Sequence, residues 1–169
     1  MLSIIDKNLV IIKEKCKNRN KILKELSTLL YKQKRIKDAN KFYKSVLERE
    51  KIQTTGIGNE IAIPHVKSGN VRLFSVAIAI CRDGIDFKSV DKKDVKLIFL
   101  IAAPQELTKI YLQLIAKIAR ILRNPKWKNK FLQADSNENV INVLYEFDKA
   151  YPDRLKLDKS SKLLLEDKE

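Results

Sequence analysis

The chain has 169 residues, of which 44% are hydrophobic, and a formal net charge of +14. This length and composition fit one globular domain with a sizeable core and exclude wholesale disorder. No apolar run approaches the roughly 20 residues that a membrane-spanning helix needs, and Asp6 and Lys7 interrupt the apolar N-terminus that a signal peptide would require. We therefore expect a cytoplasmic protein that is not embedded in a membrane.

The positive charge does not by itself indicate nucleic-acid binding. Basic residues are spread along the chain without a run of five or six, and the aromatic residues lie on apolar stripes rather than between the basic ones. Cys16 and Cys81 are too few and too scattered for a disulfide scaffold or a zinc cluster. With a single histidine in the chain, no metal site and no cofactor are expected.

Two helices and two strands are predicted in the first half of the chain. Residues 20–33 place apolar side chains on one face of a helix. A second helix begins after Asp38, a plausible N-cap, and its stripe extends to Leu47. After a glycine-rich stretch, residues 61–63 form a short apolar strand. Residues 73–81 alternate large and small side chains, which suits a strand covered on both faces, with its small side under a helix.

The second half of the chain is predicted to contain one more strand and two more helices. Residues 95–104 are almost entirely apolar and predict a central strand. A helix capped by Thr108 follows and ends at Asn124-Pro125, and a last helix begins after Ser136. The order of elements predicts an α/β fold with one domain over residues 1–150, a mixed sheet flanked by helices, and a tail at 151–169.

The only histidine lies in "TTGIGNEIAIPHVK", residues 54–67. Pro64 stiffens the chain that enters His65, and Gly56 and Gly58 permit a close approach of free amides to an anion. An imidazole beside such amides, without a serine or thiol partner, can act as a nucleophile toward phosphorus. The residues alone leave a second interpretation open, in which His65 merely ends a strand and bonds locally.

The segment "ERE…TTGIGNEIAIPHVK" resembles the signature R-E-x-x-x-S/T-T-G-I-G-x-G-I-A-I-P-H of the fructose/mannitol-type (type-2) IIA components of the bacterial phosphoenolpyruvate-dependent phosphotransferase system. The order of helices and strands matches over roughly residues 5–148. The "TGIGN" segment and the length look most similar to nitrogen-regulatory IIA proteins. The resemblance implies a mannitol-type IIA-like sandwich with helices on both faces of the sheet.

The resemblance also implies an activity. His65 corresponds to the histidine that accepts a phosphoryl group from an HPr-like carrier protein. The protein would pass this group to a IIB domain of a sugar permease, or signal its phosphorylation state to a regulatory target. Either way it would be a transferase that carries phosphohistidine, and no nucleic acid is expected as a partner.

Further site residues follow from the same resemblance. Arg49 aligns with an arginine near the phosphorylated histidine, where a fixed cation would balance phosphate charge. Gly56 and Gly58 match the family's glycines, and Thr54 and Thr55 add hydroxyl donors for a phosphate. The alternatives are a solvated cation at a helix end for Arg49 and an ordinary turn for the glycines.

Three positions depart from the family pattern. Glu60 stands where glycine is usual and is expected to bring negative charge near the site, and Val66 replaces a small residue. Tyr111 occupies the position of a second histidine that supports the phosphoryl group, although simple packing would also explain it. Glu60 and Tyr111 together suggest an alternative function, a regulatory binding protein that no longer transfers phosphate.

Overall fold

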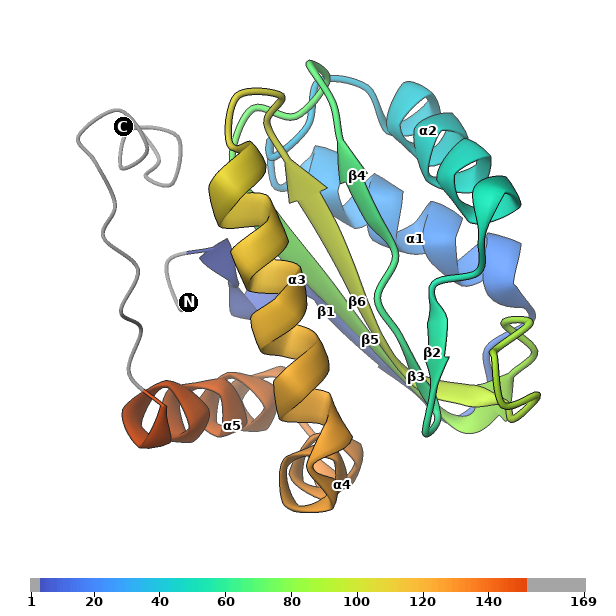
Figure 1. Ribbon diagram of the computed structural model, residues 1–169, viewed down its shortest axis with the longest axis vertical. Coiled ribbons are helices and arrows are strands. Elements are labelled where there is room, and N and C mark those ends of the chain that lie inside the picture. The colour runs from blue at the N-terminus through green and yellow to red at the C-terminus, as the bar shows by residue number, and fades with distance from the viewer. Residues whose placement is uncertain (1–3, 152–169) are drawn as a thin grey trace.

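The computed structural model describes residues 4–151. They form a six-stranded mixed sheet with helices on both faces, which confirms the predicted fold class (Figure 1). The elements in chain order are β1 (Val10–Lys13), α1 (Arg19–Lys32), α2 (Ala39–Ile52), β2 (Gly56–Gly58), β3 (Ile61–Ala62), β4 (His65–Lys67), β5 (Ser75–Ile85), β6 (Val95–Ala103), α3 (Thr108–Arg123), α4 (Pro125–Gln133) and α5 (Asn137–Ala150).

The sheet is built around the antiparallel pair β5 and β6. β1 lies parallel to β5 on one side, and β3 and β4 both lie parallel to β6 on the other. β2 pairs with β3 in an antiparallel hairpin at the edge. β3 and β4 therefore follow one another along the same side of β6, with Ile63 and Pro64 between them.

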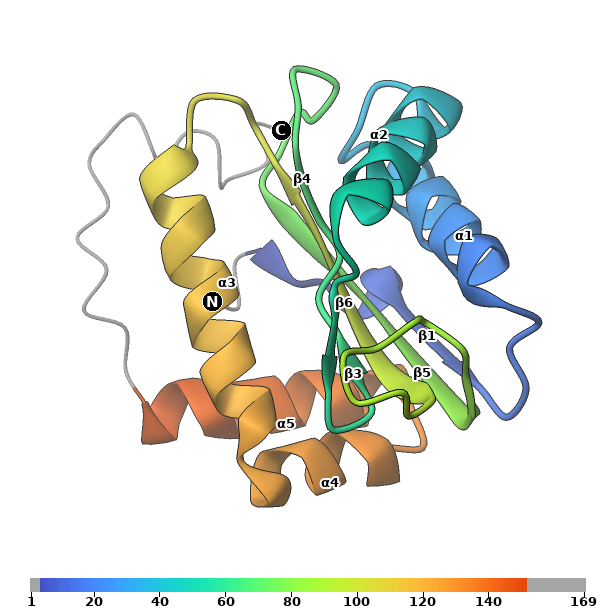
Figure 2. The same ribbon diagram turned by 45° about the vertical axis from the view of Figure 1, so that its right-hand side comes forward.

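Two apolar layers cover the faces of this sheet. α1 and α2 pack on one face, and α3, α4 and α5 pack on the other (Figure 2). The side-chain alternation of β5 divides between them as predicted, because Ala77 and Ala79 face α1 and α2 while Val76 and Ile78 face the other layer. The small side of the strand lets the first helix pair approach closely.

The helix starts are mostly as predicted. The carboxylate of Asp38 and the hydroxyl of Ser136 accept hydrogen bonds from backbone amides at the starts of α2 and α5. The assignment of Thr108 as an N-cap was wrong, since Leu107 holds that position without a side-chain cap. Asn124-Pro125 ends α3 but also begins α4, because Asn124 caps the new helix and Pro125 suits its first turn.

Several strands were not anticipated or differ in length. β1, β2 and β4 have four, three and three residues, too short for a periodic pattern. β5 continues beyond the predicted end to Ile85, through an irregularity in its pairing with β6. Gly84 permits this extension, because its φ of 79° lies in the left-handed region.

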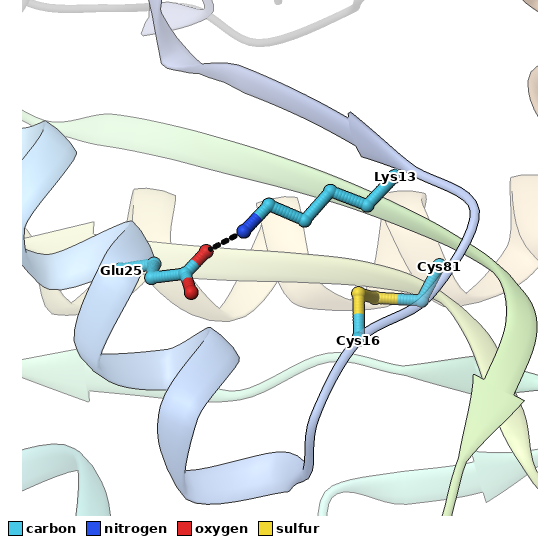
Figure 3. Close-up of a disulfide and its surroundings, with 4 residues drawn as sticks. All are labelled: Lys13, Cys16, Glu25 and Cys81. Atoms are coloured by element: carbon cyan, nitrogen blue, oxygen red, sulfur yellow. Dashed lines mark hydrogen bonds and ion pairs between the residues drawn. A yellow bond between two sulfur atoms is a disulfide. The ribbon is translucent and has the colours of Figure 1, made fainter.

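Cys16 and Cys81 form a disulfide, which the sequence analysis did not anticipate (Figure 3). Their separation of 65 positions along the sequence made the pair look scattered. In the fold, however, the parallel pairing of β1 with β5 places Lys13 opposite Cys81, and Cys16 follows three residues later. The bond ties the connection before α1 to the middle of the sheet, beside an ion pair between Lys13 and Glu25.

Within residues 4–151, no helix is both long and apolar enough to cross a membrane. The ring of Tyr151 stacks on Phe147 at 4.9 Å between centroids. Residues 152–169 of the predicted tail lie outside the described residues, so the boundary at residue 150 stays a prediction.

Candidate functional site

His65 is the first residue of β4, and its backbone is fixed by the sheet. It lies opposite Ile101 of β6, whose amide donates to the carbonyl oxygen of Pro64 at 2.8 Å. The imidazole is half-buried, and its Nδ1 lies 2.7 Å from the carbonyl oxygen of Ile63. Backbone and ring are thus both held by the strand that the apolar "IAIP" segment introduces.

Arg49 lies on the opposite side of the imidazole, in the last turn of α2. Its Nη2 is 3.1 Å from Nε2 of His65, and its Nη1 donates to the carbonyl oxygen of Gln53 at 2.9 Å. The second bond satisfies a carbonyl at the end of the helix and holds the guanidinium in place. The structure therefore brings together the two residues that the resemblance named as histidine and cation.

The two partners of the imidazole determine its tautomer. A carbonyl oxygen only accepts, so Nδ1 must carry the proton that is donated to Ile63. A guanidinium only donates, so Nε2 must present a lone pair to Arg49. The neutral Nδ1–H tautomer satisfies both contacts, and it leaves Nε2 as the nucleophilic nitrogen.

Electrostatics favour the same neutral form. Burial lowers the pKa of His65, the Ile63 carbonyl opposes this, and the Arg49 charge lowers the pKa further. Because the reference value is about 6.5, a lowered pKa keeps the ring unprotonated at pH 7. The nitrogen that faces Arg49 is therefore available for attack near neutral pH.

Tyr111 reaches the same imidazole from the first turn of α3. The ring centroids of His65 and Tyr111 are 5.8 Å apart, with an edge-to-face angle of 62°. Burial raises the pKa of the phenol, against a weaker opposing effect of Arg49, so the hydroxyl stays protonated. Within the described residues this hydroxyl has no hydrogen-bond partner, so the ring that packs against the imidazole carries an unused donor.

These three side chains share a surface hollow of about 620 Å³ between α2, β4 and the start of α3. The residues around it are mainly basic or apolar, and they include one carboxylate, that of Glu48. Its lining is Lys41, Lys44, Ser45, Glu48, Arg49, Ile52, His65, Val66, Lys67 and Tyr111. Within residues 4–151, no cluster of three or more His, Cys, Asp or Glu side chains could hold a metal ion.

The two threonines predicted to bind phosphate bond to protein groups. The hydroxyl of Thr55 donates to the buried carboxylate of Glu50, and its amide donates to the same carboxylate at 3.2 Å. The hydroxyl of Thr54 donates to the carbonyl oxygen of Phe87 at 3.0 Å. Neither threonine lines the hollow, and their role in binding phosphate stays a prediction.

The two glycines are required by close packing and by backbone conformation. A Cβ on Gly56 would lie 2.5 Å from Oγ and 2.9 Å from Cα of Ser89. Gly58 has a φ of 90°, in the left-handed region. The amide of Gly56 already donates a hydrogen bond to the Thr54 hydroxyl oxygen at 3.1 Å. A role of either glycine in holding phosphate also stays a prediction.

Glu60 does not bring its charge into the site, contrary to the expectation from sequence. It occupies the two-residue turn between β2 and β3 with a φ of 66°, a turn in which Asn59 also has a positive φ. Its carboxylate forms ion pairs with Lys96 and Lys128, and hydrogen bonds to these lysines lower its pKa. Glu60 does not line the hollow around His65.

Glu50 is the residue beneath the site that sequence reasoning missed. It is 6% exposed and receives the Thr55 bonds, with Arg19 at 3.9 Å on its other side. The sequence spacing could have indicated its burial. Glu50 follows Phe42 and Val46 at intervals of four residues, which places it on the buried face of α2. A carboxylate in an apolar row predicts a buried partner.

Comparison with known proteins gives a consistent result. Residues 3–147 match the family model described as phosphoenolpyruvate-dependent sugar phosphotransferase system, EIIA 2. The fructose-specific EIIA component of Haloferax volcanii is 38% identical over 112 residues, covering 66% of this chain and 73% of that protein. The fructose-specific EIIABC component of Bacillus subtilis is 27% identical over 86% of this chain, and the chain spans only 23% of that longer relative.

Solved structures confirm the fold. The nitrogen regulatory protein IIA-Ntr of Neisseria meningitidis superposes with a TM-score of 0.79 at 23% identity, over 85% of this chain and 97% of that chain. The mannitol IIA of Escherichia coli, in complex with phosphorylated IIB, superposes with a TM-score of 0.70 at 18% identity, over 85% of this chain and 99% of that chain.

Proposed function

We propose that this chain, which belongs to the EIIA 2 family of the phosphoenolpyruvate-dependent sugar phosphotransferase system, is a phosphocarrier that is phosphorylated on His65. The donor is an HPr-type phosphocarrier protein. The group then passes to a IIB domain or, as in a nitrogen-regulatory protein, reports phosphorylation to a regulatory target.

The observation that carries the proposal is the neutral imidazole with its Nε2 lone pair turned toward Arg49. In the transfer, Nε2 attacks the phosphorus of the donor's phosphohistidine. A new bond forms between Nε2 and phosphorus while the bond between phosphorus and the donor nitrogen breaks, and its electron pair stays on the donor's imidazole. No proton needs to leave His65, since Nδ1 keeps its hydrogen.

Each neighbour has a distinct task in this step. The Ile63 carbonyl stabilises the positive charge that develops on the imidazole as Nε2 forms its new bond. Arg49 exchanges its contact with Nε2 for a charge-assisted bond to a phosphoryl oxygen. The hydroxyl of Tyr111 donates to a second phosphoryl oxygen. Between Thr54 and Gly58, both hydroxyls and the amides of Thr55 and Gly56 bond within the protein, so this segment supports the site by holding the end of α2 in place.

The alternative function, a binding protein with a degenerate site, is not favoured. The first feature that suggested this alternative was the charge of Glu60. That charge is neutralised by Lys96 and Lys128 away from the hollow. The second was Tyr111, which lies against the imidazole and retains a donor hydroxyl. Both departures from the family pattern are compatible with transfer.

The test is phosphorylation by phosphoenolpyruvate, the first enzyme of the system and an HPr-type carrier, followed by intact-mass measurement. We expect a gain of one phosphoryl group that is lost in acid, as phosphohistidine is, and no gain in His65→Gln. Phosphorylation that persists in His65→Gln would contradict the assignment. Adding a IIB domain to the isolated phosphoprotein then tests onward transfer, which regenerates the unmodified mass.

A further inference from the structure

The hollow around His65 has a strongly basic rim. Lys41 and Lys44 come from one exposed face of α2, and Lys67 comes from the end of β4. Together with Arg49 they place four cations around one neutral histidine. From this rim we infer that the protein that docks on His65 presents an acidic face. The inference rests on the proposed function, because the docking protein is taken to be the phosphoryl donor.

The positive charges of this rim are not neutralised by carboxylates of the protein itself. Across residues 4–151, the ammonium groups of Lys41 and Lys44 have no ion-pair or hydrogen-bond partner. Lys67 donates to an uncharged group, the hydroxyl of Thr108, at 2.7 Å. Glu48, the only carboxylate of the lining, is itself paired with Lys51 at 2.6 Å. The rim therefore presents a net positive potential to an approaching molecule.

Lysines on other surfaces include paired groups and, as with Lys21 and Lys24 on α1, groups without an ion-pair partner among the described residues. Lys13 pairs with Glu25 at 2.6 Å, and Lys96 and Lys128 both pair with Glu60. These pairs neutralise charge locally. The rim lysines are therefore distinguished by their position around His65 and not by lacking a partner.

One phosphoryl group cannot account for the whole rim. Lys41 precedes Arg49 by eight residues on the same helix, which corresponds to about 12 Å along the axis. A phosphoryl group on Nε2 lies next to Arg49, which contacts that nitrogen directly, so Arg49 is the first cation to offset its charge. A phosphoryl group carries about two negative charges at most. The outer cations thus face something larger than phosphate.

A protein surface fits the remaining features. The side chain of Ile52, which also lines the hollow, is 82% exposed. An exposed apolar group beside a reactive centre, with charges at the periphery, is the arrangement of a protein interface. Complementary charge on the partner would speed its association and exclude carriers of the opposite sign.

The donor is the occupant that the charges fit best. The phosphorylated donor brings a dianionic group to His65 while all four rim cations are uncompensated. A protein that removes the phosphoryl group meets a site whose positive charge the phosphate has already partly offset. The acidic residues of the partner are therefore expected next to the donor's own phosphohistidine.

The experiment uses one HPr-type carrier in two forms, with the residues next to its phosphohistidine changed to aspartate and glutamate or to lysine. Single-turnover transfer from each form to this chain is measured at low and at high salt. We expect the acidic form to be faster by about tenfold or more at low salt, and the difference to shrink as salt screens the charges. Equal rates at low salt, or a faster basic form, would overturn the inference.

Variants of this chain locate the effect. Lys41→Glu with Lys44→Glu should abolish or reverse the preference for the acidic carrier. The matched control is Lys21→Glu with Lys24→Glu, because these exposed lysines occupy the same positions in α1 as Lys41 and Lys44 do in α2. The control should keep the preference, and a control with the same effect as the rim variant would overturn the assignment of the rim.

Phosphoramidate separates this inference from the proposed function. This small donor transfers its phosphoryl group to an imidazole with loss of ammonia, and it needs no docking surface. We expect it to phosphorylate His65 in the wild type and in both pairs of variants. Failure in the wild type would contradict the proposed function, whereas normal labelling with no carrier preference would refute the acidic partner alone.

Discussion

Glu50 and Thr55 form a buried hydrogen-bonded pair that ties the last turn of α2 to the segment leading into β2. The carboxylate receives both the hydroxyl and the amide of Thr55, and its own side chain is 1% exposed. Since Glu50 follows Arg49 directly, this pair also fixes the part of the helix that aims the guanidinium at His65.

Removing the hydroxyl from this pair is expected to destabilise the protein. Thr55→Val keeps the shape but leaves a buried carboxylate oxygen without its donor, which costs about 1–3 kcal/mol. Thr28→Val is the matched control, because the Thr28 hydroxyl bonds only to the carbonyl of Lys24 on a partly exposed helix face. Denaturant unfolding measures both. A loss of the same size in Thr28→Val would show that the effect does not come from the Glu50 contact.

The pH dependence follows from the lowered pKa of His65. The folded protein resists protonation of a group that the unfolded chain protonates at about pH 6.5. The associated stability is present above that pH and is lost as the pH falls through the folded pKa. Labelling by phosphoramidate should likewise decline over the lower range, because a protonated Nε2 has no lone pair.

NMR of the one imidazole gives the titration directly. We expect its midpoint below 6.5, and a higher midpoint in Arg49→Gln, where the neighbouring charge is gone. A midpoint at or above the reference value in the wild type would contradict the neutral, partly buried imidazole.

Arg49→Ala should slow phosphorylation far more than it affects stability. The guanidinium contacts Nε2 and one carbonyl at the helix end, so its loss removes one modest structural bond, worth about 0.5–1.5 kcal/mol. Arg49→Lys keeps the charge, but an ammonium cannot reproduce the planar guanidinium that contacts Gln53 and His65 at once. We therefore expect an intermediate rate of phosphorylation. Unchanged phosphorylation together with a large fall in melting temperature would assign Arg49 a purely structural role.

Tyr111 supplies an uncharged donor where relatives are expected to have histidine. Loss of a preorganised donor at a reaction centre can cost about 10²–10³ in rate. We expect Tyr111→Phe to be slower than wild type, and Tyr111→His, which regains a group that can become a cation, to be faster. Single-turnover phosphorylation by one carrier decides this, and equal rates for all three proteins would leave Tyr111 a packing residue.

Gly56→Ala tests whether the glycine is needed for packing. The new methyl would meet the backbone of Ser89 at 2.9 Å, so we expect a loss of about 1–3 kcal/mol. Gly69→Ala is the control, since a Cβ there meets no atom within 4 Å. Phosphoramidate labelling well below the melting temperature then reports on the site itself, and unimpaired labelling of Gly56→Ala would argue against a direct role in binding phosphate.

The sequence predicted those parts of the fold that depend on local pattern. Asp38 and Ser136 cap helices because capping involves residues three positions apart. β4 has only three residues and exists because β6 offers it a partner, which no local pattern reveals. The disulfide was missed for a similar reason, since parallel pairing of β1 and β5 brings its two cysteines together.

The candidate site likewise has residues that the sequence identified and relationships that it did not. His65, Arg49 and Tyr111 were named from the family resemblance, and in the structure they line one hollow. The supporting role of Glu50 and the basic rim depend on how α2 is oriented against β4. Those relationships are tertiary, and the spacing of residues along the chain carries only an indirect signal of them.

The bond between Cys16 and Cys81 gives the chain a covalent ring, and both Arg49 and His65 belong to that ring while Tyr111 lies outside it. A single cut of the backbone anywhere between residues 17 and 80 would therefore leave two polypeptides that remain joined through sulfur. The histidine-bearing piece would separate from the rest only after reduction. While the disulfide is intact, such a cut leaves His65, Arg49 and Tyr111 in one covalent molecule, because Tyr111 follows Cys81 along the backbone.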